Sequence, residues 1–185
     1  SCSGSLGGTV AFNKTGLGAD VTIGSGCSVS LGASPTSTLS QTYSTWAGGL
    51  TNNGTITVAS GTWTVNNWAS AITNNGTITH NGSGWDINGG DLVNNAGGTI
   101  TYAGTSLSIE RNLTQSGTFD LTGKTITFDS WNNNLESTIN CSGSLGGTVA
   151  FDKRALGDRV TIGSGCSVSL GANPTSTLSE VYTTW

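Results

Sequence analysis

The chain has 185 residues, of which only 9% are charged, and its formal net charge is −4. With Lys and Arg numbering six in all, it lacks the clustered cations that nucleic-acid binding needs to replace counterions. No apolar run approaches the roughly 20 residues of a membrane-spanning helix, so we expect neither a nucleic-acid partner nor membrane insertion.

The first 46 residues read as short segments in which apolar and polar residues alternate. Segments 9–12, 21–23 and 27–31 are separated by Gly-rich turns, a pattern typical of β-strands. Alternation with a period of two places Cys27, Val29 and Leu31 on one face. We therefore expect short strands with an apolar inner face.

From residue 50 onward one phrase, Leu-Thr-Asn-Asn-Gly-Thr-Ile-Thr, recurs with small variations. Its glycines Gly54, Gly76 and Gly98 are equally spaced, whereas the next interval, to Gly117, is slightly shorter. A fixed period in the twenties, built from a turn and alternating Thr and Ile, indicates a parallel β-solenoid. We predict an all-β fold with coils of about 22 residues and three short strands in each coil.

The Asn-Asn-Gly turns predict two further features. Asn and Gly tolerate positive φ, so we expect left-handed backbone at these turns. Because the asparagines recur once per coil, we also expect them to form a hydrogen-bonded ladder.

A longer repeat relates the two ends of the chain. Residues 2–46 match residues 141–185 at an offset of 139, with 36 of 45 positions identical. We predict one continuous solenoid over residues 1–185, in which 2–140 form a full unit of about six coils and 141–185 begin the next. Such a unit adds about 30 Å of rod at roughly 4.8 Å per coil. Together with the lack of any Met, the repeat leads us to expect a longer protein with tandem copies stacked end to end.

The four cysteines form two pairs, and the spacing within each pair is the same. We expect disulfides between Cys2 and Cys27 and between Cys141 and Cys166, with Cys141 in the inward column of the first strands. Two disulfides favour an extracellular or cell-surface location. Unpaired buried thiols are the alternative.

Outward threonines are the clearest candidate for a functional surface. They recur in two parallel ranks, which consist of Thr55, Thr57, Thr77, Thr79, Thr99 and Thr101. This regular array resembles the ice-binding face of β-solenoid antifreeze proteins. The alternative is that Thr is simply a favourable outward residue in any strand.

The tryptophans predict core packing at some positions and leave a glycan contact open at others. Trp63 and Trp85 fall in an inward column and are expected in the core. Trp68 and Trp131 lie near turns, where they either stack on a glycan or pack at a corner.

No residue constellation predicts catalysis. His80, the only histidine, falls in an inward column and reads as a space filler, since no partner for a catalytic base is evident. The acidic residues Asp86, Asp91, Asp120 and Asp129 fall at different strand positions. We therefore expect no enzyme activity, no cofactor and no metal site.

The repeated phrase and the bias toward Ser, Thr, Asn and Gly resemble the solenoid regions of large bacterial adhesins of the filamentous-haemagglutinin type. They also resemble giant repetitive surface proteins of gliding bacteria. The resemblance implies a secreted, rod-like structural or adhesive fibre, with lateral self-association and cell-surface or glycan contacts as further partners. The alternatives are an ice-binding protein and a carbohydrate-binding or carbohydrate-active β-helix.

Overall fold

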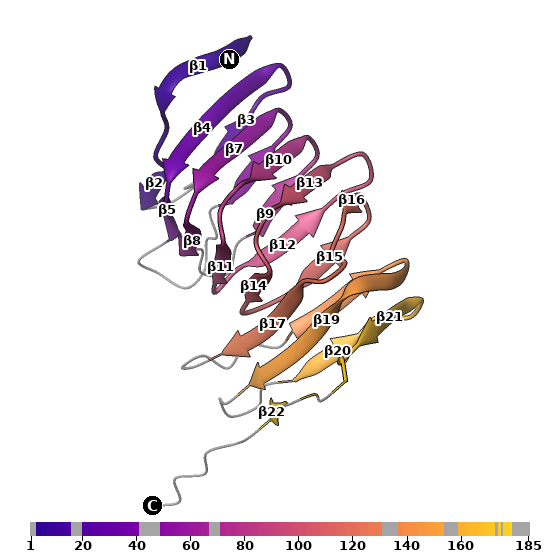
Figure 1. Cartoon of the computed structure of the whole chain (residues 1–185). Helices are drawn as coiled ribbons and strands as arrows, with labels where there is room; N and C mark the ends of the chain where they lie inside the picture. Colours follow the sequence, from indigo (N-terminus) through magenta and orange to yellow (C-terminus); the bar gives the residue numbers. More distant parts are fainter. Residues whose placement is uncertain are drawn as a thin grey trace, which may run out of the picture.

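The computed structural model describes residues 3–15, 20–40, 49–66, 71–130, 137–153, 159–172, 174 and 176–178. These residues form a parallel β-solenoid whose coils are stacked from β1 at one end to β21 and β22 at the other (Figure 1). The predicted fold class is confirmed. Among the described residues no helix has the length and apolar character needed to span a membrane.

Three parallel sheets run the length of the stack. The first contains β1 (Gly4–Thr9), β4 (Cys27–Ala33), β7 (Thr55–Ser60), β10 (Thr77–His80), β13 (Thr99–Tyr102) and β16 (Thr118–Phe119). The second contains β2 (Asn13–Thr15), β5 (Thr36–Ser40), β8 (Thr62–Asn66), β11 (Gly84–Asn88), β14 (Ser106–Ile109), β17 (Thr125–Ser130), β19 (Gly143–Lys153), β21 (Cys166–Ser169) and β22 (Thr177–Leu178). The third contains β3 (Val21–Ile23), β6 (Leu50–Asn52), β9 (Ala71–Asn74), β12 (Asp91–Asn94), β15 (Leu113–Gln115), β18 (Ser137–Cys141) and β20 (Val160–Ile162).

Strands in the middle of each sheet pair in parallel with the strand one coil before and the strand one coil after, and the first sheet ends at β16, which pairs with β13. In the first sheet Ile78 lies between Ile56 and Ile100. The strands β1 to β18 make about six coils of three strands, and β19 begins the next coil. Three strands per coil, as predicted, is therefore the observed arrangement.

The core is the inside of the tube. It is filled by every second residue of each strand, the residue whose side chain points inward. Ile56, Trp63 and Ile72, one from each sheet of the same coil, are fully buried. Strands such as β10 and β11 alternate between half-buried and buried positions along their whole length. Because backbone groups pair with the coil above or below, coils stabilise one another and do not fold singly.

The Asn-Asn-Gly corners differ from the prediction. Neither the asparagines nor the glycines of the turns at Gly54 and Gly76 have positive φ. Glycine is required at these turns because neighbouring coils approach each other closely. A Cβ on Gly76 would overlap the carbonyl oxygen of Gly54. A Cβ on Gly54 would likewise overlap the carbonyl oxygen of Cys27.

The two copies of the long repeat adopt the same strand register. Asn13 pairs with Thr38 between β2 and β5, and Asp152 pairs with Thr177 between β19 and β22. Both residues of the second pair lie 139 positions after those of the first. These two residues therefore keep the same pairing in both copies of the repeat.

Candidate functional site

The threonine array lies on the outer face of the first sheet, as predicted. Thr77 pairs with Thr55 below it and Thr99 above it. Thr79 pairs in the same way with Thr57 and Thr101. The register has no shift across these three strands, so the threonines form two straight ranks.

The ranks continue beyond the threonines that the sequence indicated. Ser28 and Ser30 of β4 pair with Thr55 and Thr57, which extends both ranks by one coil. Thr118 continues one rank beyond Thr99. The serines could have been recognised because they alternate with Val29 as the threonines alternate with Ile56.

An acidic residue ends the regular part of this face. The exposed carboxylate of Asp120 follows β16 and accepts a hydrogen bond from the backbone N–H of Thr122 at 3.0 Å. Hydrogen bonds from the backbone and the hydroxyl of Thr122 lower the pKa of Asp120. The charged end and the uncharged array are therefore chemically distinct.

The array presents hydroxyl and methyl groups at regular intervals. Neighbouring strands are about 4.8 Å apart, and alternate residues along a strand are about 6.8 Å apart. Its threonines and serines carry no charge and no group that titrates near neutral pH. This surface is suited to contacts with an extended, uncharged and repetitive partner.

Asparagines form two ladders at the corner beside the array. In the inner ladder Asn52 donates to Asn74 at 2.8 Å, Asn74 donates to Asn94 at 2.8 Å, and Asn94 donates to Gln115 at 3.2 Å. The three asparagines are fully buried. The predicted ladder is thus present, and it lies in the core.

The outer ladder consists of the next asparagine of each turn. Asn75 donates to Asn53 at 2.8 Å, and Asn95 donates to Asn75 at 2.7 Å. Asn53 and Asn75 are exposed. Both ladders hold the corner of the tube in a fixed register beside the threonine ranks.

An aromatic cluster fills the tube behind the array. Trp63 and Trp85 stack with ring centroids 5.1 Å apart, and His80 meets the ring of Tyr102 edge-on at 5.0 Å. All but Tyr102 are fully buried, and Tyr102 is nearly so. Trp63 and Trp85 are core residues, as predicted.

His80 occupies the inward column between Val58 and Tyr102. Its Nδ1 accepts a hydrogen bond from the backbone N–H of Gly82 at 2.9 Å, so the ring proton is on Nε2. Burial lowers the pKa of His80 to about 4. The imidazole is therefore neutral near pH 7 and packs as part of the core.

An acidic column follows the outer face of the second sheet, and the sequence did not reveal it. Asp129 pairs with Asp152, and Glu110 occupies the same column one coil earlier. Burial, and then the negative charge of Asp129, raise the pKa of Glu110. Burial is also the main reason that the pKa of Asp129 is raised. Strand register was needed to find this column, because its members belong to different coils and are distant from one another in the sequence.

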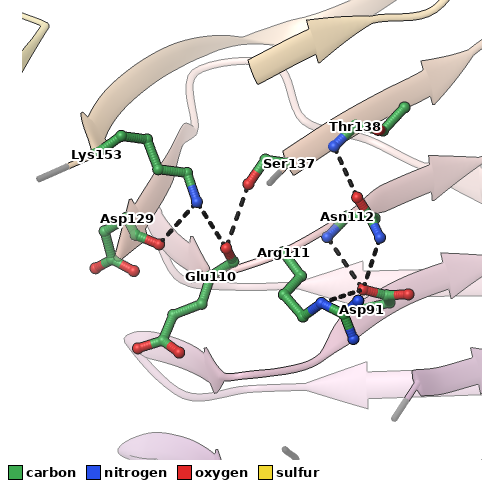
Figure 2. Close-up of polar contacts among 8 residues, drawn as sticks. All are labelled: Asp91, Glu110, Arg111, Asn112, Asp129, Ser137, Thr138 and Lys153. Atoms are coloured by element: carbon green, nitrogen blue, oxygen red, sulfur yellow. Dashed lines mark hydrogen bonds and ion pairs between the residues drawn. The ribbon is translucent and has the colours of Figure 1, made fainter. Parts of the chain in front are cut away.

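Lys153 lies beneath this column. Figure 2 shows its amine directed at two backbone carbonyl oxygens, those of Glu110 at 2.7 Å and Asp129 at 3.2 Å. The side chain is almost completely buried. One lysine therefore links three successive coils, which contain β14, β17 and β19.

A second polar cluster joins β12 to β18. Asp91 accepts hydrogen bonds from the backbone and side-chain amides of Asn112 at 3.2 and 3.0 Å (Figure 2). Arg111 lies 3.8 Å from the same carboxylate oxygen, and the Asn112 side chain accepts from the backbone of Thr138 at 2.7 Å. The cluster satisfies backbone groups and has a structural role.

A disulfide joins Cys141 and Cys166, with Cα atoms 4.8 Å apart, as predicted. Cys141, however, ends β18 in the third sheet and pairs with Gln115. The expectation that it continues the inward column of the first strands is wrong, because β18 pairs with β15 and therefore belongs to the third sheet. For the pairing of Cys2 with Cys27, Cys2 lies outside the described residues.

The glycan-stacking candidates Trp68 and Trp131 also lie outside the described residues. Within the part of the chain that the structure describes, no group of three or more His, Cys, Asp or Glu side chains is arranged to hold a metal ion.

Comparisons with protein-family models, with curated proteins and with solved structures found no match for this chain. The class that the fold defines is a β-solenoid with three parallel sheets.

Proposed function

We propose that this chain is a segment of a stiff structural fibre, built from tandem copies of the long repeat that continue one solenoid. The proposed role is mechanical rather than catalytic. The fibre would project or hold apart whatever lies beyond its ends.

The observation that carries the proposal is the burial of one repeated leucine. Leu6, in the first coil, is 43% exposed, whereas Leu145, its equivalent in the second copy of the repeat, is 4% exposed. The difference arises because a coil precedes Leu145: an added Cβ on neighbouring Gly147 would lie 2.9 Å from the carbonyl oxygen of Leu121. An apolar residue at the start of a unit thus has a place against the end of the unit before it.

Lys153 supports the same proposal. It belongs to the repeated segment 141–185, yet its amine binds carbonyl oxygens in the last two coils of the preceding unit. A buried lysine amine is costly unless its hydrogen bonds are satisfied. The start of one unit is therefore chemically matched to the end of another.

Small-angle X-ray scattering of chains with one, two and three complete units tests the proposal. Each added unit should lengthen the particle by about 29 Å, which is six coils at about 4.8 Å, while the cross-sectional radius stays constant. A cross-section that grows with the number of units would contradict the rod.

An extracellular location fits this role, because the Cys141–Cys166 disulfide persists in oxidising surroundings. A fibre of the filamentous-adhesin kind would be accessible to added protease on intact cells. Complete protection on intact cells, with cleavage after lysis, would place the protein inside the cell.

Ice binding is a second candidate, which the unshifted register of the threonine array favours. If the array binds ice, Thr77→Tyr and Thr79→Tyr should abolish thermal hysteresis, since a tyrosine would project from the middle of the ranks. Thr114→Tyr, on the outer face of the third sheet, is the matched control. Lack of hysteresis in the unaltered chain at high concentration would exclude this candidate.

Glycan binding is tested separately on a glycan array. A signal that falls on Trp68→Ala or Trp131→Ala would support a carbohydrate contact. Absence of binding by the unaltered chain would exclude it.

A further inference from the structure

Four asparagines of the chain are followed directly by glycine, namely Asn53, Asn75, Asn81 and Asn88. In such a pair the backbone nitrogen of the glycine can attack Cγ of the asparagine, because glycine has no Cβ to obstruct the approach. The attack closes a succinimide ring and releases the side-chain amide as ammonia. All four pairs carry the same reactive groups, so the structure decides which of them reacts.

The four asparagine side chains differ in how firmly they are held. Ring closure turns the side chain toward the next backbone nitrogen and breaks the hydrogen bonds that it makes. Asn75 donates to Asn53 at 2.8 Å, and this bond holds both residues. Asn88 is half-buried and donates to Asn66 at 3.1 Å. Asn81 is exposed, and no hydrogen bond holds its side chain in the part of the chain that the structure describes.

The attacking nitrogen beside Asn81 is that of Gly82, and its proton already has an acceptor. The backbone N–H of Gly82 donates to Nδ1 of His80 at 2.9 Å. This nitrogen of the imidazole has a lone pair, since the ring proton is on Nε2. Gly82 is buried, so the group in contact with its proton is the imidazole. A base is therefore placed on the atom that has to lose a proton.

We propose that His80, Asn81 and Gly82, at the corner between β10 and β11 (Figure 1), form a self-modifying site that converts Asn81 to aspartate and isoaspartate. As the nitrogen of Gly82 bonds to Cγ of Asn81, its proton passes to Nδ1 of His80. The bond between Cγ and Nδ2 then breaks, and His80 returns the proton to the leaving nitrogen, which departs as ammonia. Water opens the ring by breaking either of its two C–N bonds, and no oxidant or cofactor is consumed.

The surroundings of His80 keep this base neutral. Burial lowers the pKa of His80 to about 4, and it raises the pKa of Tyr102, which faces the imidazole from β13, to about 12. The other rings against the imidazole are tryptophans, which do not titrate. The charged side chains beside this cluster are Asp86 of β11 and Lys124, whose amine lies 5.3 Å from the centre of the Tyr102 ring. Nδ1 of His80 is therefore free to accept a proton throughout the neutral range.

The two products affect the fold differently. Aspartate at position 81 replaces an exposed amide by an exposed carboxylate and leaves the backbone unchanged. Isoaspartate inserts a methylene group into the backbone just before Gly82, where there is no free space: a Cβ on Gly82 would overlap the carbonyl oxygen of Gly61. Formation of isoaspartate should therefore loosen the corner between β10 and β11.

Peptide mapping by mass spectrometry, after incubation of the folded full chain at neutral pH, tests the choice of site. Asn81 should be converted first, and each hydrogen bond that has to break should slow another pair about two- to tenfold. In urea, where no side chain is held, the four pairs should react at similar rates. Conversion of Asn75 as fast as Asn81 in the folded chain, or the same preference for Asn81 in urea, would overturn the proposal.

His80→Val tests the base, since Val58 occupies the same column one coil earlier. Conversion of Asn81 should slow at least about tenfold, which is less than the usual contribution of a general base because the lowered pKa makes this imidazole a weak one. Conversion of Asn53 in the same molecules, the internal control, should not change. If His80 only restrains the turn, its removal frees the N–H of Gly82, and Asn81 reacts faster. An unchanged or faster reaction would overturn the role of His80.

The pH profile of the unaltered chain is a second test, which needs no variant. A reaction driven by hydroxide accelerates about tenfold for each pH unit, whereas a reaction through neutral His80 does not depend on pH once the imidazole is neutral. The rate at Asn81 should therefore be constant between about pH 6 and pH 8 in the folded chain and rise steeply in urea. A steep rise in the folded chain would overturn the proposal. The fibre would be unaffected, because its scattering test does not involve Asn81.

Discussion

At the scale of single residues, whether a side chain lies inside or outside the tube decides how much its hydrogen bonds contribute to stability. Asn74 and Asn75 are neighbours in the same turn, yet Asn74 is buried and Asn75 is exposed. The buried amide has no water to replace a lost partner, whereas the exposed one has. The inner ladder is therefore the one that determines stability.

We predict that Asn74→Ala lowers the free energy of unfolding by at least about 2 kcal/mol, because Asn52 and Asn94 each lose a buried partner. Asn75→Ala, the matched control, should change it by no more than about 0.5 kcal/mol. Urea denaturation of both variants measures the difference. Equal losses would show that burial does not distinguish the two ladders.

His80 should make stability depend on pH. Its pKa is lowered to about 4 in the folded chain and is about 6.5 when unfolded, so the unfolded chain takes up a proton first as the pH falls. The free energy of unfolding therefore begins to fall near pH 6.5 as the pH is lowered. The fall is complete near pH 4 and amounts to about 3 kcal/mol.

His80→Val isolates this effect, since Val58 occupies the same column one coil earlier. The half-buried carboxyls of Asp86, Glu110 and Asp129 have raised pKa values, and so their contribution to the free energy of unfolding falls with rising pH. These carboxyls are present in both the unaltered chain and His80→Val. Their contributions therefore largely cancel when the free energies of unfolding of the two proteins are subtracted. The urea midpoints of the unaltered chain and of His80→Val are measured at pH 7 and at pH 4. If the difference between the two midpoints is the same at both pH values, the role of His80 is contradicted.

At the scale of elements, the coil spacing is set where the chain turns between sheets. Gly76 lies directly over Gly54, and there is no room between them for a side chain. By contrast, an added Cβ on Gly7 in β1 would meet no atom within 4 Å. Two glycines of similar appearance in the sequence thus have different roles.

We predict that Gly76→Ala costs about 3 kcal/mol or more, because the backbone of two coils must move apart. Gly7→Ala should change stability by no more than about 0.5 kcal/mol. Thermal unfolding followed by circular dichroism compares the two variants. A tolerated alanine at position 76 would mean that the coils separate easily at this corner.

At the scale of the whole molecule, equivalent residues differ only in what lies above or below them. Leu6 is exposed at one end of the stack and Leu145 is buried within it. The apolar contacts of a unit are therefore completed by its neighbours, as expected for a solenoid in which each coil contacts only the adjacent ones.

We predict that Leu145→Ala lowers the free energy of unfolding by about 2–5 kcal/mol, the usual cost of a buried Leu-to-Ala change. Leu6→Ala in the same chain should cost no more than about 0.5 kcal/mol. When a complete unit is added before residue 1, Leu6→Ala should become as costly as Leu145→Ala. A cost that stays small in the longer chain would argue against the proposed junction.

The sequence by itself determined the period of the coil, the three strands and the faces of their residues. Alternation along a strand and repetition at the coil period are local properties, so Ile78 and Thr77 could be assigned to opposite faces without coordinates. The threonine array followed from the same two properties. The extension of the array to Ser28 could also have been predicted from the sequence, because Ser28 and Ser30 alternate with Val29.

Only the tertiary structure decided features that depend on the contact between coils. Glycine at position 76 is required by the carbonyl of the coil below, whereas the sequence predicted a positive φ there. Lys153 is buried because its amine reaches two earlier coils, and Cys141 lies in the third sheet because its strand pairs with β15. These outcomes depend on which atoms lie across the gap between coils, and that information resides in the stacking rather than in any single stretch of chain.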